Sequence, residues 1–192
     1  MRIVLLGAPG SGKGTQAALM VERLGIQHIS TGALLRNAAK RGTELGLKAK
    51  ALIDKGELVP DEIMSDMIEE RLGRDDVAKG FILDGYPRNL AQARSLDKVL
   101  ERLNTPADEV IQLDVNPELI IGRIAKRAKE EDRSDDTEEV VRNRMRIYHE
   151  QTAPVIDHYA GKGLLTYVLA DGEIEVVLER ILAALKVNHP SS

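Results

Sequence analysis

A glycine-rich segment directly after the first apolar run has the composition of a phosphate-binding site. In Gly7-Ala8-Pro9-Gly10-Ser11-Gly12-Lys13-Gly14-Thr15, the positions of Gly7, Gly12 and Lys13 match the spacing of a phosphate-binding loop. Glycines let successive backbone N–H groups surround an anion, and a helix that starts here directs its positive N-terminus at the same phosphates. Lys13 can then bridge the β- and γ-phosphates of a nucleotide.

Two oxygen-bearing side chains could hold a divalent cation beside these phosphates. Gly14 stands where a hydroxyl is expected after Lys13, and the hydroxyl comes one residue later, as Thr15. A second apolar run ends in an acid, Asp84, and a carboxylate at the end of such a strand can hold the hydration shell of Mg²⁺. We expect Thr15 and Asp84 to contribute to a magnesium site through water. The alternative role for Asp84 is a helix cap.

Composition limits the kinds of ligand and compartment. The 192 residues include no cysteine, which excludes disulfides, thiolate nucleophiles and cysteine-bound zinc and suits a reducing compartment. The formal charge of −4 and the aromatic content of 3% argue against a nucleic-acid or anionic-membrane surface. No apolar run is long enough to span a bilayer. We therefore expect a cytoplasmic protein that binds small anions at a local positive site.

Alternating apolar runs and amphipathic stretches predict the scaffold. This alternation is typical of an α/β fold in which helices cover both faces of a parallel sheet. The expected strands are residues 2–7, 27–30, 81–84, 110–114 and 164–169. The expected helices are residues 13–24, 89–103, one that starts at 117, one over 135–159 that Pro154 kinks, and 174–185.

Two segments do not fit this alternation and are candidates for moving parts. Residues 30–59 have helical patterning interrupted by glycines, which indicates an inserted cap. Residues 126–136 are a dense run of mixed charges between two helices. Taken alone, such a run also fits a solvated turn.

The motifs together make the chain resemble the adenylate kinase family of nucleoside monophosphate kinases. Besides the phosphate loop they are Ser30-Thr31-Gly32-Ala33-Leu34-Leu35-Arg36, Asp84-Gly85-Tyr86-Pro87-Arg88-Asn89-Leu90-Ala91-Gln92, Tyr148-His149-Glu150-Gln151-Thr152-Ala153-Pro154 and Asp171-Gly172. The resemblance implies one kinase domain over residues 1–192, built on a five-stranded parallel sheet of the P-loop NTPase type. Residues 30–59 would be its AMP-binding insert and residues 126–136 a short lid.

The resemblance also implies the reaction and the roles of residues. The family transfers the terminal phosphoryl group of MgATP reversibly to AMP, which gives two ADP and maintains adenine nucleotide levels. ATP would be bound by Gly10, Ser11, Gly12, Lys13, Gly14, Thr15, Arg123, Arg127 and Ile174. AMP would be bound by Thr31, Arg36, Glu57, Leu58, Val59, Gly85, Arg88, Gln92, Arg133 and Arg144. The catalytic charges would come from Lys13, Arg88, Arg127, Arg133 and Arg144.

Gln92 is the expected reader of the AMP base. Its planar amide can accept from the adenine amino group and donate to the adjacent ring nitrogen. Its alternative role is that of an exposed helix residue. We expect no catalytic role for the four histidines, because transfer of a phosphoryl group depends on positioning and charge rather than on a general base.

The chain departs from the family pattern at two points, and two other functions stay open. The lid is short and, without cysteines, cannot hold the structural zinc of many bacterial relatives, and Ala33 stands where an acid is usual. Asn89 resembles the UMP/CMP kinases on the same fold, although Thr31 and Gln92 oppose that assignment. A non-catalytic nucleotide-binding switch is the other alternative. We expect a monomer.

Overall fold

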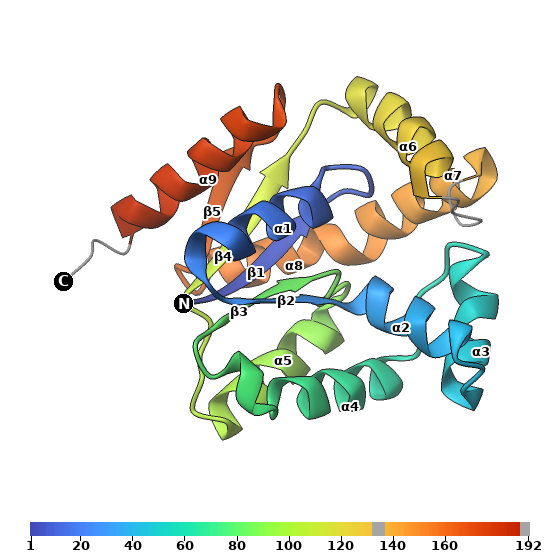
Figure 1. Cartoon of the computed structure of the whole chain (residues 1–192), viewed down its shortest axis with the longest axis horizontal. Coiled ribbons are helices and arrows are strands. Elements are labelled where there is room, and N and C mark those ends of the chain that lie inside the picture. Colours follow the sequence, from blue (N-terminus) through green and yellow to red (C-terminus); the bar gives the residue numbers. More distant parts are fainter. Residues whose placement is uncertain (132–136, 189–192) are drawn as a thin grey trace.

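The molecule is built on a five-stranded, all-parallel sheet with the strand order β2-β3-β1-β4-β5 (Figure 1). This computed structural model describes residues 1–131 and 137–188, and its side chains for 1–124 and 137–186. The strands are β1 (Arg2–Gly7), β2 (Gln27–Ser30), β3 (Phe81–Asp84), β4 (Glu109–Asp114) and β5 (Leu165–Leu169). The predicted five-stranded α/β fold is therefore confirmed, and each strand boundary lies within one residue of its expected position.

Helices surround this sheet. They are α1 (Lys13–Leu24), α2 (Thr31–Lys40), α3 (Glu44–Ile53), α4 (Asp61–Leu72), α5 (Leu90–Arg102), α6 (Pro117–Glu131), α7 (Glu138–Ile147), α8 (Ala153–Ala160) and α9 (Ile174–Asn188), with the short turns η1 (Asp75–Val77) and η3 (Tyr148–Thr152). The sequence patterns above do not specify α4, which the structure adds before β3.

Two hydrophobic cores lie on opposite faces of the sheet. Because successive strand residues point to opposite faces, Ile3 and Leu5 of β1 belong to one core and Val4 and Leu6 to the other. The first core packs against α1, α6 and α9, and the second against α4, α5 and α8. Figure 1 shows α9 on one side of the strands and α4 and α5 on the other. The sheet is thus a rigid base whose carboxyl ends can carry a site.

The connections from β1 and β3 diverge at the carboxyl edge of the sheet. The chain after β1 runs through α1 to β2 on one side, whereas the chain after β3 runs through α5 to β4 on the other. In the register of the sheet, Leu5 lies opposite Asp84, and so does Ser30. Ligands of open α/β sheets bind where the strand connections diverge in this way.

The predicted long helix after residue 135 is interrupted one turn before its proline. Pro154 has no N–H to donate and its ring crowds the preceding turn, and the helix widens into η3 before it continues as α8. Its first turn is capped by Thr137, whose hydroxyl accepts from the backbone N–H of Val140 at 3.4 Å. Residue 135, where this helix is predicted to begin, lies outside the described residues.

Residues 30–59, predicted to form an inserted cap, contain two helices, α2 and α3, that project beyond the carboxyl edge of the sheet. Helices α2 and α3 pack on each other and lie near α7 in Figure 1. Asn143 of α7 donates from Nδ2 to the carbonyl oxygen of Lys55 at 2.8 Å. The insert therefore forms one wall of the space above the strands, and α7 forms another.

Candidate active site

The glycine-rich loop joins β1 to α1, as its spacing predicts. Helix α1 begins at Lys13, directly after Gly12, whose backbone has the left-handed φ of 94°. The Lys13 ammonium group folds over the loop and donates to the carbonyl oxygens of Gly7 at 2.8 Å and Ala8 at 3.0 Å. A Cβ atom at Gly7 would lie 2.9 Å from the carbonyl oxygen of Leu113, so β4 leaves no room for a side chain there. The loop thus presents main chain and one cation to a ligand.

Asp84 ends β3 beside this loop. Burial would raise the pKa of Asp84, but the hydrogen bond from His28 and the positive charges of Lys13, His28 and Arg88 outweigh it, and the pKa lies below its ordinary value. The His28 Nε2 and Asp84 Oδ2 atoms are 3.4 Å apart. Asp84 is therefore held as a carboxylate. No sequence pattern indicates this pairing with His28, which comes from the neighbouring strand β2.

The donor set near Asp84 fits a hydrated magnesium ion. Asp84 and Thr15 both line the same cleft, and the position of a Cβ at Gly14 lies 3.7 Å from Asp84 Oδ2. Among the described residues, no group of three or more His, Cys, Asp or Glu side chains could hold a metal ion by itself. Mg²⁺ keeps several waters and is often held by one carboxylate and the phosphates of a nucleotide. Ala33 lines this cleft without offering a ligand.

A cleft of about 880 Å³ extends along the phosphate loop. That volume is within the range of small-molecule sites. Of the residues predicted to bind ATP, those that line it are Gly10, Gly12, Lys13, Gly14, Thr15, Arg123 and Ile174. Ser11, which belongs to the same loop, is buried, and its hydroxyl lies 3.4 Å from Lys13 Nζ. Arg127 lies in α6 beyond the described side chains.

One end of this cleft is formed where α9 begins. Ile174 is 52% exposed there, and its carbonyl oxygen accepts from Gln16 Nε2 at 2.9 Å. Arg123 donates to the carbonyl oxygen of Ala170 at 2.9 Å. Gln16, which is buried in α1, thus links the helix of the phosphate loop to Ile174, one of the residues expected to bind ATP, and no sequence pattern indicated this contact.

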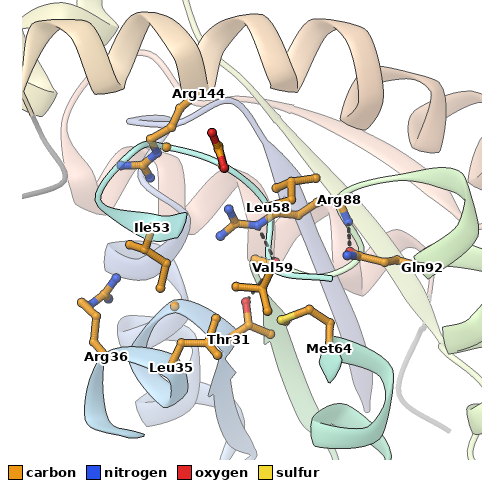
Figure 2. Close-up of a pocket in the computed structure, with 14 residues that line it drawn as sticks. Thr31, Leu35, Arg36, Ile53, Leu58, Val59, Met64, Arg88, Gln92 and Arg144 are labelled. Carbon is orange, nitrogen blue, oxygen red and sulfur yellow. Dashed lines mark hydrogen bonds between the residues drawn. The ribbon is translucent and has the colours of Figure 1, made fainter. Parts of the chain in front are cut away.

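A second, smaller cavity opens from the cleft between the insert and the sheet (Figure 2). Of the residues predicted to bind AMP, those that line it are Thr31, Arg36, Glu57, Leu58, Val59, Gly85, Arg88, Gln92 and Arg144. Arg133 lies outside the described residues. The structure adds apolar walls that the sequence analysis did not assign, namely Leu35, Ile53 and Met64.

The carbonyl oxygen of Gly85 holds the floor of this cavity together. It accepts from the Thr31 hydroxyl at 2.9 Å and from Arg88 Nε at 2.8 Å. Gly85 has a φ of 84°, and a Cβ there would lie 2.7 Å from the Thr31 hydroxyl oxygen. Glycine at this position therefore lets α2 and the segment after β3 approach closely enough to form one floor.

Gln92 is only 2% exposed, so its alternative role as an exposed helix residue is wrong. Its Oε1 accepts from the backbone N–H of Arg88 at 2.8 Å, the contact drawn in Figure 2, and its Nε2 donates to Asp61 Oδ1 at 2.8 Å. Each polar end of an amide can take part in two hydrogen bonds. Gln92 Oε1 and Nε2 can therefore each form one further hydrogen bond with a base in the cavity.

The two cavities share three arginines. Arg36, Arg88 and Arg144 line both of them, and Figure 2 shows them converging from α2, from the segment after β3 and from α7. Guanidinium groups bind phosphate oxygens in bidentate fashion and stay charged at every physiological pH. The arrangement can thus gather two phosphate chains at one point, one from each cavity.

No described helix is both long and apolar enough to cross a bilayer.

Comparison with known proteins identifies related chains over almost the whole length. The family model described as "Adenylate kinase" matches residues 5–164. A protein of Stenotrophomonas maltophilia (strain K279a) named "Adenylate kinase" is 57% identical over 186 residues, which cover 97% of this chain and 100% of the relative. Proteins with the same name from Xanthomonas campestris pv. campestris (strain 8004) and Xanthomonas euvesicatoria pv. vesicatoria (strain 85-10) are 56% and 55% identical over 185 residues, 96% of this chain and 99% of each relative.

Proposed function

Since this chain belongs to the adenylate kinase family, we propose that its cleft holds ATP and its smaller cavity AMP, with their phosphates facing one another. The enzyme transfers the terminal phosphoryl group of ATP reversibly to AMP, giving two ADP. UMP/CMP kinase activity and a non-catalytic switch are not favoured by the names of its relatives. The observation that carries the proposed arrangement is that Arg36, Arg88 and Arg144 line both cavities.

We propose that ATP binds along the phosphate loop, with its base toward the start of α9. The loop and the N-terminus of α1 would hold the phosphates through backbone N–H groups and Lys13. To do so, the Lys13 ammonium must leave the carbonyl oxygens of Gly7 and Ala8 that it contacts here. The cleft runs from the loop to Gly172 and Ile174, which supports this direction for the nucleotide.

AMP would lie in the smaller cavity with its phosphate at Arg36, Arg88 and Arg144. Apolar side chains form the sides of the cavity, and Thr31 and Gln92 are its buried polar groups. A cavity of this kind rejects a base that leaves its polar groups unpaired more strongly than an apolar pocket rejects a wrong shape. The main chain of residues 57–59 would follow the nucleoside.

Catalysis in this arrangement rests on alignment and charge. Transfer of a phosphoryl group requires the attacking and leaving oxygens to be in line and the charge on the transferring group to be balanced. Arg88 and Arg144 would place positive charge next to the transferring group on the AMP side, and Lys13 would do so on the side of the phosphate loop. Arg127 and Arg133 are proposed to add to them, as the family resemblance implies.

We propose Mg²⁺ as the cofactor, held at Asp84 and Thr15 through water. When bound there, the ion would supply positive charge that balances the phosphates of ATP. The proposal is supported by the lowered pKa of Asp84 and by the position of both side chains on the cleft. Replacement of Asp84 by Asn is expected to raise the Mg²⁺ concentration needed for half-maximal binding of ATP, measured by titration calorimetry.

Residues 30–59 are proposed as the AMP-binding insert and residues 126–136 as a short lid, of which 132–136 lie outside the described residues, within one kinase domain over residues 1–192. Closure of both over the nucleotides would keep water from the transferring group. We further propose that the protein acts as a monomer in the cytoplasm. One chain supplies the described lining of both cavities, and the sequence has no cysteine to oxidise.

A coupled assay tests the proposed function. MgATP is supplied with AMP, CMP, UMP or GMP in separate reactions, and ADP formation is measured. We expect fast turnover with AMP. A preference for CMP or UMP would favour the pyrimidine kinase, and only slow hydrolysis of ATP would favour the switch.

The two-site arrangement has its own test. A molecule that joins two adenosines through a chain of phosphates should bind with one molecule per chain and much more tightly than ATP. Equal affinity for this molecule and for ATP would contradict the proposal that two nucleotides bind together.

A further inference from the structure

A closed set of hydrogen bonds lies behind the buried amide of Gln92, on the side away from the smaller cavity. Asp61, the first residue of α4, accepts at Oδ1 from Gln92 Nε2 at 2.8 Å and from Asn89 Nδ2 at 2.9 Å. Asn89, the N-cap of α5, accepts at Oδ1 from the backbone N–H of Gln92 at 2.9 Å. The backbone N–H of Arg88 donates to Gln92 Oε1.

These partners permit only one orientation of the Gln92 amide. An ionised carboxylate accepts hydrogen bonds and cannot donate them, and a backbone N–H only donates. If the amide turned over, its oxygen would face the Asp61 carboxylate and its NH₂ group would face the N–H of Arg88. Both contacts would then be repulsive. The orientation of Asn89 is set in the same way, because its oxygen is held by the Gln92 backbone, so its NH₂ group must face Asp61.

The orientation of this amide decides which purine it can read. Adenine presents an amino donor next to a ring-nitrogen acceptor, so it pairs with an amide that offers oxygen and NH₂ in the matching order. A 6-oxopurine such as hypoxanthine presents an acceptor next to a ring N–H donor, which is the reverse order. An amide that could turn over would pair with either base.

We propose that Asp61, oriented by Asn89, is a positioning residue that fixes the Gln92 amide for adenine and against 6-oxopurines. The inference rests on the proposed role of Gln92 as the reader of the AMP base. Asp61 does not itself line the cavity, whereas Gln92 does, so Asp61 acts only through Gln92. The proposal also gives Asn89 a role that does not depend on resemblance to the UMP/CMP kinases: Asn89 holds Asp61 and caps α5.

Titration calorimetry of AMP and IMP, with the ratio of their Kd values as the readout, tests this assignment. Asp61→Ala removes the acceptor and should lower the preference for AMP over IMP by about tenfold or more, since a hydrogen bond to a charged group contributes about 1.5–3 kcal/mol. Asp61→Asn keeps an oxygen that the two amide donors can hold, and it should retain most of the preference. A purely structural role of Asp61 would weaken both nucleotides equally.

Glu62→Ala is the matched control. Glu62 is an exposed acid in the same first turn of α4, so its removal changes the charge at that helix end without touching Gln92, and it should leave the Kd ratio unchanged. Asn89→Ser keeps a helix cap and removes the donor to Asp61. It should lower the ratio by about fivefold, less than Asp61→Ala does, because the hydrogen bond from Gln92 Nε2 to Asp61 remains. This variant tests the inference if Asp61→Ala does not fold, and an unchanged ratio would contradict it.

Measuring Asp61→Ala in a chain that also carries Gln92→Ala distinguishes failure of this inference from failure of its premise, the role of Gln92 in recognising the AMP base. Asp61→Ala should have no further effect on the Kd ratio when Gln92 is absent. If Gln92→Ala itself left the ratio unchanged, the proposed role of Gln92 in reading the base would fail, and this inference with it. If Gln92→Ala lowered the ratio and Asp61→Ala did not, or if Asp61→Asn lost as much preference as Asp61→Ala, the role of Asp61 alone would be wrong.

Discussion

The phosphate loop and the smaller cavity, each proposed to bind one end of a nucleotide, are built in different ways. The loop, residues 7–15, is one short stretch that offers backbone N–H groups and a single lysine. The cavity takes its polar groups from α2, from the segment after β3, from the first turn of α5 and from α7. A site made of main chain can be encoded by local spacing, whereas a site made of side chains depends on the packing that brings distant elements together.

The two regions also differ in what holds their polar groups in place. In the loop, glycines admit the backbone conformation and the close approach of β4. In the cavity, three polar side chains are held by other residues: Thr31 by Gly85, Arg88 by Gly85, and Gln92 by Asp61. The cavity therefore has more positions at which a substitution can act without touching a nucleotide.

The largest effect is expected at Arg88, which belongs to both cavities. Arg88→Ala should lower kcat by about 10²-fold or more, because it removes a charge that we propose stabilises the transferring group. Steady-state kinetics with MgATP and AMP measures this. Arg94→Ala, an exposed arginine of α5, is the control and should leave kcat unchanged. A kcat of Arg88→Ala within twofold of the parent would mean that the two sites do not meet at this residue.

Two glycines of the loop should respond differently to alanine. Gly12→Ala meets nothing within 4 Å but must adopt a left-handed backbone, which costs about 1–2 kcal/mol and raises the KM for MgATP about tenfold. Gly7→Ala adds a close approach to the Leu113 carbonyl oxygen, so its effect should be larger. The KM for AMP should stay within about twofold in Gly12→Ala. Equal effects of the two substitutions would show that β4 does not constrain the loop.

The free energy of unfolding should depend on pH through the ionisation of Asp84. Its pKa in the folded protein is below the ordinary value of 3.8, so it contributes stability that is present above that value and is lost as the pH falls through the folded pKa. Thermal unfolding of the parent and of Asp84→Asn between neutral and strongly acidic pH measures this. The parent should be the more stable at neutral pH, and the difference should shrink below about pH 4. A constant difference would contradict the ion pairing of Asp84.

The smallest effect is expected at Ile174. The family resemblance implies that ATP contacts the main chain of this segment, so Ile174→Ala should change the KM for MgATP by less than about twofold, as for other exposed substitutions. Gln16→Ala, which removes the hydrogen bond to the Ile174 carbonyl oxygen, should have the larger effect of the two. The reverse order would show that the side chain of Ile174, and not its backbone, forms the base end of the cleft.

Sequence patterns predicted the scaffold more completely than the contacts behind the site. The strands and α1 followed from apolar runs and from glycine spacing, which act over neighbouring residues. These patterns did not indicate helix α4, so they also did not predict the position of Asp61, its first residue. The pairing of His28 with Asp84 depends on the order in which β2 and β3 join the sheet. Strand order is a property of the whole fold and leaves no local signal.

By itself, the sequence determined that a phosphate-binding loop follows β1, that five parallel strands alternate with helices, and that the residues typical of an AMP site are present. Only the tertiary structure decided that Arg36, Arg88 and Arg144 meet between two cavities and that Asp61 lies behind Gln92. The physical reason is the range of the interactions involved. Hydrophobic periodicity and turn geometry act within a few residues, whereas the orientation of a buried polar side chain is set by hydrogen-bond partners that lie far away along the chain.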